Sequence, residues 1–139
     1  MTGGGFKVYT ETIRFNTRGE VDFVDLTGRV AEAVRKSGIR NGLAHVFAPH
    51  ATAIITLNEY TPDLLRDLED MLERLVPRRG SYEHPVNAHS HLRSMLMNPS
   101  RTIPVVDGRL VLGTWQSIIF VDVDTHPRSR TVVVQVVGE

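Results

Sequence analysis

The sequence predicts a single α+β domain with largely antiparallel β-sheets, two main helices and one short helix. The chain has 139 residues, a length typical of one domain. Its strand patterns follow one another as consecutive hairpins, whereas a parallel fold would alternate strands with helices. No repeat, low-complexity segment or linker divides it, so we expect one domain over residues 1–139.

Strand patterns, in which polar and apolar residues alternate or apolar residues run together, recur along the chain. We expect strands at residues 6–15, 20–25, 43–48, 52–58, 102–106, 109–112, 115–123 and 130–137. Turn signals separate them, most clearly Asp107-Gly108, a dipeptide typical of tight hairpins. Their succession favours hairpin pairing between neighbours in the chain.

Helix start and stop signals mark the first two helices. Thr27 is expected to cap a helix that runs to Ser37, and Gly38 suits the left-handed residue that ends it. The second helix begins with Thr61 as its cap and Pro62 in the first position, and Pro77 lies beyond its end.

The second helix carries an apolar stripe that we expect to be core. Its members are Leu64, Leu65, Leu68, Met71, Leu72 and Leu75. A shorter helix over residues 88–97 is expected next, with Asn87 as its cap and Asn98-Pro99 as its stop.

Composition limits the possible functions. Sixteen basic and sixteen acidic residues give no net charge, which argues against a nucleic-acid or anionic-membrane binder. The absence of cysteine excludes disulfides, thiolate nucleophiles and thiolate metal sites. Residues 1–5 have no basic or apolar stretch and no membrane-length apolar run occurs, so we expect a cytoplasmic protein.

Several common catalytic motifs are missing from the chain. It has no G-x-G-x-x-G after a strand, no Walker A loop, no H-E-x-x-H and no G-x-S-x-G. Dinucleotide oxidoreductases, P-loop NTPases and serine hydrolases of the common kinds are therefore not expected.

The histidines are candidate metal ligands. His84, His89 and His91 fall within eight residues, and His50 stands at a strand break. Neutral imidazoles are common metal ligands, and three with an open position resemble a catalytic zinc site. On a helix His89 and His91 point about 200° apart, so only one is expected to ligate. The alternative is that these histidines bind no metal and are surface residues or hydrogen-bonded loop residues. His45 and His126 are expected to be structural or solvent-facing.

Other candidates allow two interpretations each. Glu59, beside Asn58, is a general base, a ligand or an orienting carboxylate, or else a solvated residue at a helix entry. Arg128 and Arg130 lie on one strand face and form a phosphate clamp or a charged sheet edge. Trp115 is a core anchor or stacks on a ring ligand.

Four ordered blocks of the sequence resemble the YjbQ family. They are His50–Glu59, which reads H-A-T-A-I-I-T-L-N-E; Asn87–Leu92, which reads N-A-H-S-H-L; Ile103–Gln116; and the turn Pro127–Arg130. The resemblance spans nearly the whole chain. It departs from the family pattern at Asn98, at the acidic position represented here by Asp122 or Asp124, and at His126, which replaces a glycine.

The resemblance implies a small α+β homotrimer with sites near the subunit boundaries. It also implies secondary thiamine-phosphate synthase activity, which joins a hydroxymethylpyrimidine pyrophosphate to a thiazole phosphate and releases pyrophosphate. The positions that match the family are His50, Thr52, Asn58, Glu59, His84, Asn87, His91, Trp115, Gln116, Arg128 and Arg130. Among the paired histidines, His91 takes the family's position.

We therefore hypothesise a divalent-metal site, with zinc as the first expectation, made by His50, His84 and His91 with Glu59 nearby. Glu59, His50 and His91 would be catalytic. The substrate and its phosphates would be bound by Thr52, Asn58, Asn87, Trp115, Gln116, Arg128 and Arg130. The metal and the arginine pair would stabilise the departing pyrophosphate.

Two other functions fit the same residues. One is a metal-dependent phosphohydrolase of a small phosphorylated metabolite, with metal-bound water as nucleophile and Glu59 as base. The other is a non-catalytic metabolite-binding trimer. No nucleic-acid or membrane partner is expected in either case.

Overall fold

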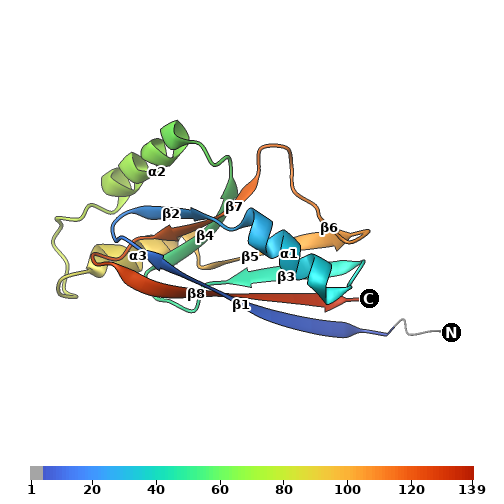
Figure 1. The fold of residues 1–139 in the computed structure, drawn as a ribbon. Coiled ribbons are helices and arrows are strands. Elements are labelled where there is room, and N and C mark those ends of the chain that lie inside the picture. Colours follow the sequence, from blue (N-terminus) through green and yellow to red (C-terminus); the bar gives the residue numbers. More distant parts are fainter. Residues whose placement is uncertain (1–4) are drawn as a thin grey trace.

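Two antiparallel sheets and three helices make up the computed structural model, which describes residues 5–139 (Figure 1). The larger sheet has the strand order β1-β8-β3-β5-β6, and the smaller has the order β2-β7-β4. The strands are β1 (Lys7–Thr17), β2 (Asp22–Asp25), β3 (Gly42–Phe47), β4 (Ala53–Asn58), β5 (Ser100–Val106), β6 (Arg109–Leu110), β7 (Ser117–Asp122) and β8 (Arg128–Gly138). The helices are α1 (Thr27–Ser37), α2 (Pro62–Leu75) and α3 (Ala88–Met97). Residues 1–4, in which no signal sequence is expected, lie outside the described residues.

The predicted α+β class with antiparallel sheets is confirmed, but the strand pairing differs from consecutive hairpins. Only β5 and β6 pair as neighbours in the chain. β1 pairs with β8 and β2 pairs with β7, so the turn at residues 18–21 carries the chain from one sheet to the other. The alternation of a strand determines which face it buries, whereas its pairing edge is set by the rest of the fold.

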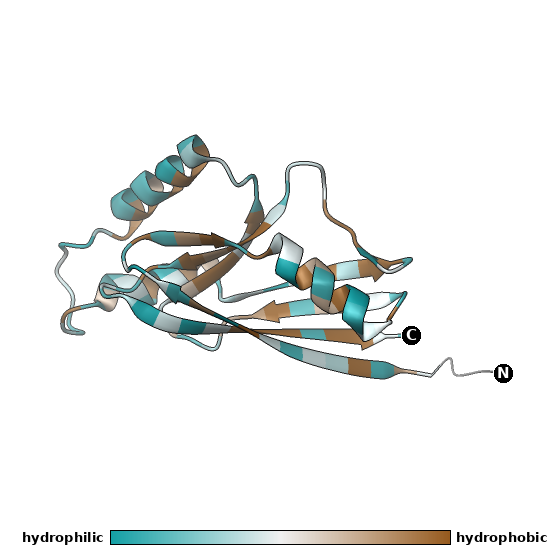
Figure 2. Cartoon of the chain, viewed as in Figure 1, coloured by the Kyte–Doolittle hydropathy of each residue, from teal (hydrophilic) through white to brown (hydrophobic). Residues whose placement is uncertain are grey.

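The main core lies between the larger sheet, the smaller sheet and α1. It is formed by Ile13, Val34, Val46, Ile55, Phe120, Val134 and neighbouring apolar residues. The opposite face of the smaller sheet is also buried, where Ile54 and Ile119 pack with Leu72 of α2. Because β7 is covered on both faces, its sequence is a continuous apolar run (Figure 2).

The predicted bounds of α1 and α3 are confirmed, but one cap is not. The prediction of Thr27 as the cap of α1 is wrong, because Thr27 is the first helical residue. Leu26 occupies the cap position without a side-chain cap, and Asp25 before it accepts hydrogen bonds at Oδ1 from the Thr27 amide at 3.0 Å and the Thr27 hydroxyl at 2.7 Å. Gly38 ends α1 with φ 69°, and Asn98 ends α3 with φ 74°.

Helix α2 packs less deeply than its stripe predicts. The expectation that the whole stripe is core is wrong: only Leu72 is buried, Leu65 and Leu68 are half-buried, and Leu64 and Leu75 are exposed. In Figure 1 the helix stands at the edge of the molecule, outside the smaller sheet. Within residues 5–139, no helix is long and apolar enough to cross a membrane.

The outer face of the larger sheet points away from the core. Register places three parallel rows of residues across four of its strands: Val8, Val137, Leu43 and Pro104; Thr10, Gln135, His45 and Thr102; and Thr12, Val133, Phe47 and Ser100. We call these twelve residues the outer face. None has a formal charge when His45 is neutral, although 23% of the chain is charged. Val8 is 56% exposed, Leu43 46% and Phe47 39%.

Candidate functional site

Nine of the eleven predicted site residues form two groups at opposite ends of the smaller sheet, and His84 and His91 form a separate pair. The first site group is His50, Thr52, Asn87, Arg128 and Arg130. The second site group is Asn58, Glu59, Trp115 and Gln116. Strand β4 pairs with β7 from Ala53↔Asp122 beside the first group to Asn58↔Ser117 beside the second. Six residues of strand separate them by roughly 20 Å. The metal-site hypothesis expected Glu59 to lie near His50. Within one chain it does not, so this expectation is wrong for the single chain.

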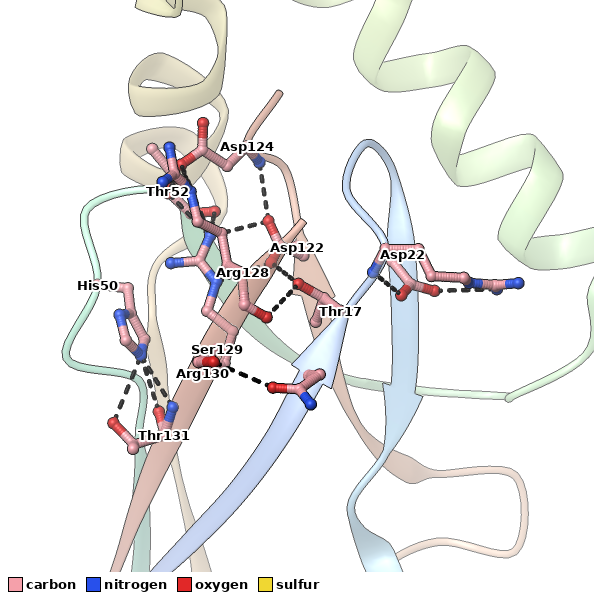
Figure 3. A network of polar contacts seen from close by, with 12 residues as sticks. Thr17, Asp22, His50, Thr52, Asp122, Asp124, Arg128, Ser129, Arg130 and Thr131 are labelled. Carbon is pink, nitrogen blue, oxygen red and sulfur yellow. Dashed lines mark hydrogen bonds and ion pairs between the residues drawn. The ribbon is translucent and has the colours of Figure 1, made fainter. Parts of the chain in front are cut away.

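Arg130 is the buried centre of the first site group (Figure 3). Its Nε and Nη2 donate to the two carboxylate oxygens of Asp122 at 2.7 and 2.8 Å, and Nη2 also reaches the Thr52 hydroxyl at 3.0 Å. Asp122 further accepts a hydrogen bond from the Thr17 hydroxyl. Arg130 is 5% exposed and Asp122 0%. This bidentate pair fixes the start of β8 against β7.

Asp124 organises the exposed side of the same group. Its carboxylate accepts hydrogen bonds from Arg128 Nε at 3.0 Å, the Thr52 hydroxyl at 3.1 Å and Asn87 Nδ2 at 3.4 Å. Burial alone would raise the pKa of Asp124, but the Thr125 amide, Arg128 and Asn87 outweigh it and lower the pKa to about 2. The Arg128 side chain stays 45% exposed, so its guanidinium faces solvent beside the buried pair.

The lowered pKa of Asp124 predicts a pH dependence of stability. A carboxyl whose pKa falls from 3.8 to about 2 on folding stabilises the protein by about 2 kcal/mol above pH 4, and this is lost as pH falls through 2. Urea unfolding at pH 7, 4, 3 and 2 measures it. Asp124→Asn should lose less stability than wild type between pH 4 and 2. Asp70→Asn, an exposed control, should follow wild type; identical profiles for Asp124→Asn and wild type would contradict the assignment.

His50 completes a strand ladder. The register of β3 with β8 ends at Phe47↔Val133, and the His50 ring then meets the Thr131 backbone. Its Nε2 lies 3.1 Å from both the Thr131 amide nitrogen and carbonyl oxygen. Burial, and then the charge of Arg130, lower the pKa of His50 below its usual value, so the ring is neutral at neutral pH. Pro49 has no amide hydrogen with which to continue the pairing of β3 with β8. The His50 ring instead makes the hydrogen bonds to the Thr131 backbone.

His84 and His91 lie together, as the metal-site hypothesis expected. Their ring centroids are 4.9 Å apart with an interplanar angle of 74°. They border a hollow of about 350 Å³ that Tyr82 and Met95 also line. Within residues 5–139, however, no three His, Asp or Glu side chains converge to hold a metal ion. One chain alone does not provide the three-histidine set.

His89 points away from His91, as helical geometry predicts. It is buried, and its Nε2 lies 2.8 Å from Glu20 Oε1. The same oxygen faces Arg78 Nε at 3.5 Å and Arg93 Nη1 at 3.8 Å. This network ties the turn before β2 to α3 and so holds the first turn of α3, where Asn87 and His91 lie.

The second site group lies on loops and strand ends. Glu59 follows β4 and is half-buried, and no partner of its carboxylate is found among residues 5–139. Trp115 lies in the turn before β7 and is 70% exposed, so the core-anchor interpretation is wrong. Gln116 Oε1 accepts a hydrogen bond from the Gly113 amide at 2.8 Å, which orders this turn.

Asp122 and Asp124 are the main site residues that sequence reasoning did not assign. They appeared only as positions that depart from a family pattern. Their alternation at the end of an apolar strand, followed by Arg128 and Arg130 with the same spacing, is the signal that could have paired them.

A family model described as "UPF0047 protein YjbQ-like" matches residues 11–139. A UPF0047 protein of Methanothermobacter thermautotrophicus is 44% identical over 136 residues, which cover 96% of this chain and 94% of that protein. The UPF0047 protein YugU of Bacillus subtilis is 33% identical over 135 residues, which cover 92% of this chain and 98% of YugU.

Solved structures share the fold. A YbjQ-like protein of unknown function from Sulfolobus solfataricus superposes with a TM-score of 0.94 at 36% identity, covering 97% of this chain and 100% of that one. A YjbQ/UPF0047 protein from Clostridium acetobutylicum gives a TM-score of 0.86 at 40% identity, covering 91% of this chain and 98% of that one.

Proposed function

Because this chain belongs to the YjbQ (UPF0047) family, we propose that it is a secondary thiamine-phosphate synthase whose site is shared between copies of the chain. The single observation that supports a shared site is the separation of the two site groups by roughly 20 Å of β4. A small phosphorylated substrate does not span that distance. The reaction would take place in the cytoplasm.

The proposed reaction exchanges one bond for another. The ring nitrogen of the thiazole phosphate attacks the methylene carbon of the hydroxymethylpyrimidine pyrophosphate. The carbon–oxygen bond breaks, and pyrophosphate leaves with the electron pair. The nitrogen becomes part of a cationic thiazolium ring, so no proton is transferred in this step. Negative charge builds on the leaving oxygen, which fixed cations stabilise.

The first site group would hold the pyrophosphate. Arg128 presents a guanidinium that is 45% exposed, and Asp124 fixes its orientation. Arg130 donates to Asp122 and Thr52, so its role in the proposal is mainly to position the start of β8. Asn87 lies beside Asp124 and would contact the phosphates from the first turn of α3. Glu59, Trp115 and Gln116 of a neighbouring copy would contact the rings.

We propose that the outer face joins the copies into a homotrimer. Twelve neighbouring sheet positions without a formal charge are unusual on a water-exposed face, and large apolar patches mark interaction surfaces. In a cyclic assembly each contact joins two different surfaces of the same chain. One end of the smaller sheet can then meet the opposite end of the next copy.

A divalent ion, zinc in the first place, would bind at the His84–His91 pair if a neighbouring copy completed the ligand set. The pair supplies two imidazoles 4.9 Å apart between ring centroids, one fewer than a typical catalytic zinc site. Elemental analysis of the purified protein beside His91→Ala tests this. One ion per chain that the variant loses is the expected result, and equal metal content in both would contradict it.

The transfer reaction is tested by incubating the protein with both substrates together and with each one alone. Thiamine phosphate and pyrophosphate should form only when both are present. Release of phosphate from one substrate alone would favour the phosphohydrolase instead. Tight binding of both substrates without turnover would favour the metabolite-binding trimer. Either result would overturn the proposed transferase.

A further inference from the structure

We propose that the groove between α2 and the smaller sheet binds a small, ring-bearing organic cation. The groove has a volume of about 280 Å³. Leu65, Leu68 and Met71 of α2 form one wall, and Ile119 of β7 and Met97 of α3 form the other. An apolar cleft of this size with a few polar groups at its rim is typical of a small-molecule site.

The charge of the groove selects a cation. Its only charged lining residues are the acids Glu59 and Asp67, and no Lys, Arg or His among residues 5–139 lines it. The Glu59 carboxylate is half-buried and has no hydrogen bond or ion pair with any described residue. Apolar walls reduce the screening of these carboxylates by water, which strengthens their attraction for a cation inside the groove.

The packing of α2 explains why the groove is open. Its apolar side touches the sheet mainly through Leu72, and Leu64 and Met71 remain 37% and 36% exposed. A flat apolar ring would cover these side chains, and the methionine sulfurs of Met71 and Met97 would contact its edge. A volume of about 280 Å³ matches a single small ring compound, so we assign the groove to a small ligand.

The identity of the ring rests on the proposed function. Transfer to a neutral thiazole nitrogen produces a thiazolium, which is an apolar ring with a fixed positive charge. Glu59 belongs to the second site group and also lines the groove. The groove would therefore favour the cationic product ring over the neutral ring from which it forms.

The test compares 3,4-dimethylthiazolium with 4-methylthiazole, which differ by one methyl group and one charge. Binding is followed by NMR of protein labelled at the methionine methyl groups. Met71 and Met97 line the groove, whereas Met95 lies on the exposed side of α3 and serves as an internal reference. The cation should shift the Met71 and Met97 signals and leave Met95 unchanged, and the neutral ring should bind at least fivefold more weakly.

Matched charge variants locate the site. Glu59→Gln and Asp67→Asn should each weaken binding of the cation by about fivefold. Asp70→Asn removes the same charge from α2 outside the groove and should leave binding unchanged. No shift at Met71 and Met97, or equal binding of both rings, would overturn the proposal. Because the binding assay needs no turnover, its outcome is independent of the transfer assay. The groove can fail to bind the cation while the transfer reaction succeeds, and it can bind the cation while the transfer reaction fails.

Discussion

Replacing Arg130 by methionine is expected to lower the free energy of unfolding by about 3–5 kcal/mol, because it leaves a buried carboxylate without its partner. Asp122 is fully buried, and both of its oxygens accept from Arg130. The Thr17 hydroxyl and the Asp124 amide, both uncharged, would then be its remaining hydrogen-bond donors. Urea unfolding of the variant at pH 7 measures the loss.

Two further variants separate the buried charge from other effects. Arg128→Met breaks an ion pair whose arginine is 45% exposed, and should cost about 1 kcal/mol or less. Adding Asp122→Asn to Arg130→Met removes the unpaired charge and should recover part of the lost stability. Equal losses for Arg130→Met and Arg128→Met would show that the Arg130–Asp122 pair is not the buried centre described above.

Replacing Phe47 by glutamate is expected to dissociate the proposed trimer without unfolding the chain. Phe47 lies in an outer row beside Val133 and stacks on His45 with ring centroids 6.2 Å apart. A carboxylate placed there would lose its hydration when the interface forms, which costs several kcal/mol for each copy. Sedimentation equilibrium should give about 47 kDa for wild type and 15.6 kDa for the variant.

Leu75→Glu is the matched control for this experiment. Leu75 is an exposed leucine at the end of α2, away from the larger sheet, so this variant should keep the mass of the wild type. Circular dichroism should show the same secondary structure in all three proteins. A Phe47→Glu protein that is folded and still trimeric would exclude the outer face as the interface.

The helices could be predicted closely from sequence because local signals define them. Gly38, Pro62 and Asn98 each suit one backbone conformation, and α1, α2 and α3 have the expected bounds. The cap of α1 could not be assigned as reliably, because the cap position falls on Leu26, which lies between two residues of the types that usually cap helices, Asp25 and Thr27.

The strand partners could not be predicted, since alternation fixes a buried face and leaves the pairing edge open. The same limit applies to α2. Its stripe shows that one side is apolar, but how much of that side meets the sheet depends on the loops that place the helix. The uncharged outer face was visible only after register aligned β1, β8, β3 and β5.

The sequence allowed most residues of the candidate site to be named, but it did not show which of them lie together. The opposite direction of His89 follows from helical geometry, and the structure confirms it. The approach of His84, which lies in the loop before α3, to His91 was expected from the metal-site hypothesis, and the two rings do lie together. The separation of Glu59 from His50 was also accessible from the sequence, because a six-residue strand must place its ends far apart. The alternation of Asp122, Asp124, Arg128 and Arg130 could have suggested that they pair, but which residues pair and how deeply they are buried required the tertiary structure.

The most direct test of a shared site is complementation between two inactive variants. Arg128→Ala removes a cation from the first site group, and Glu59→Ala removes the carboxylate from the second. Each variant alone should lack transferase activity. In trimers that mix the two at random, one site in four combines an intact first group with an intact second group of the next copy, so about a quarter of wild-type activity should return. Mixed trimers that stay inactive would show that each site belongs to one chain.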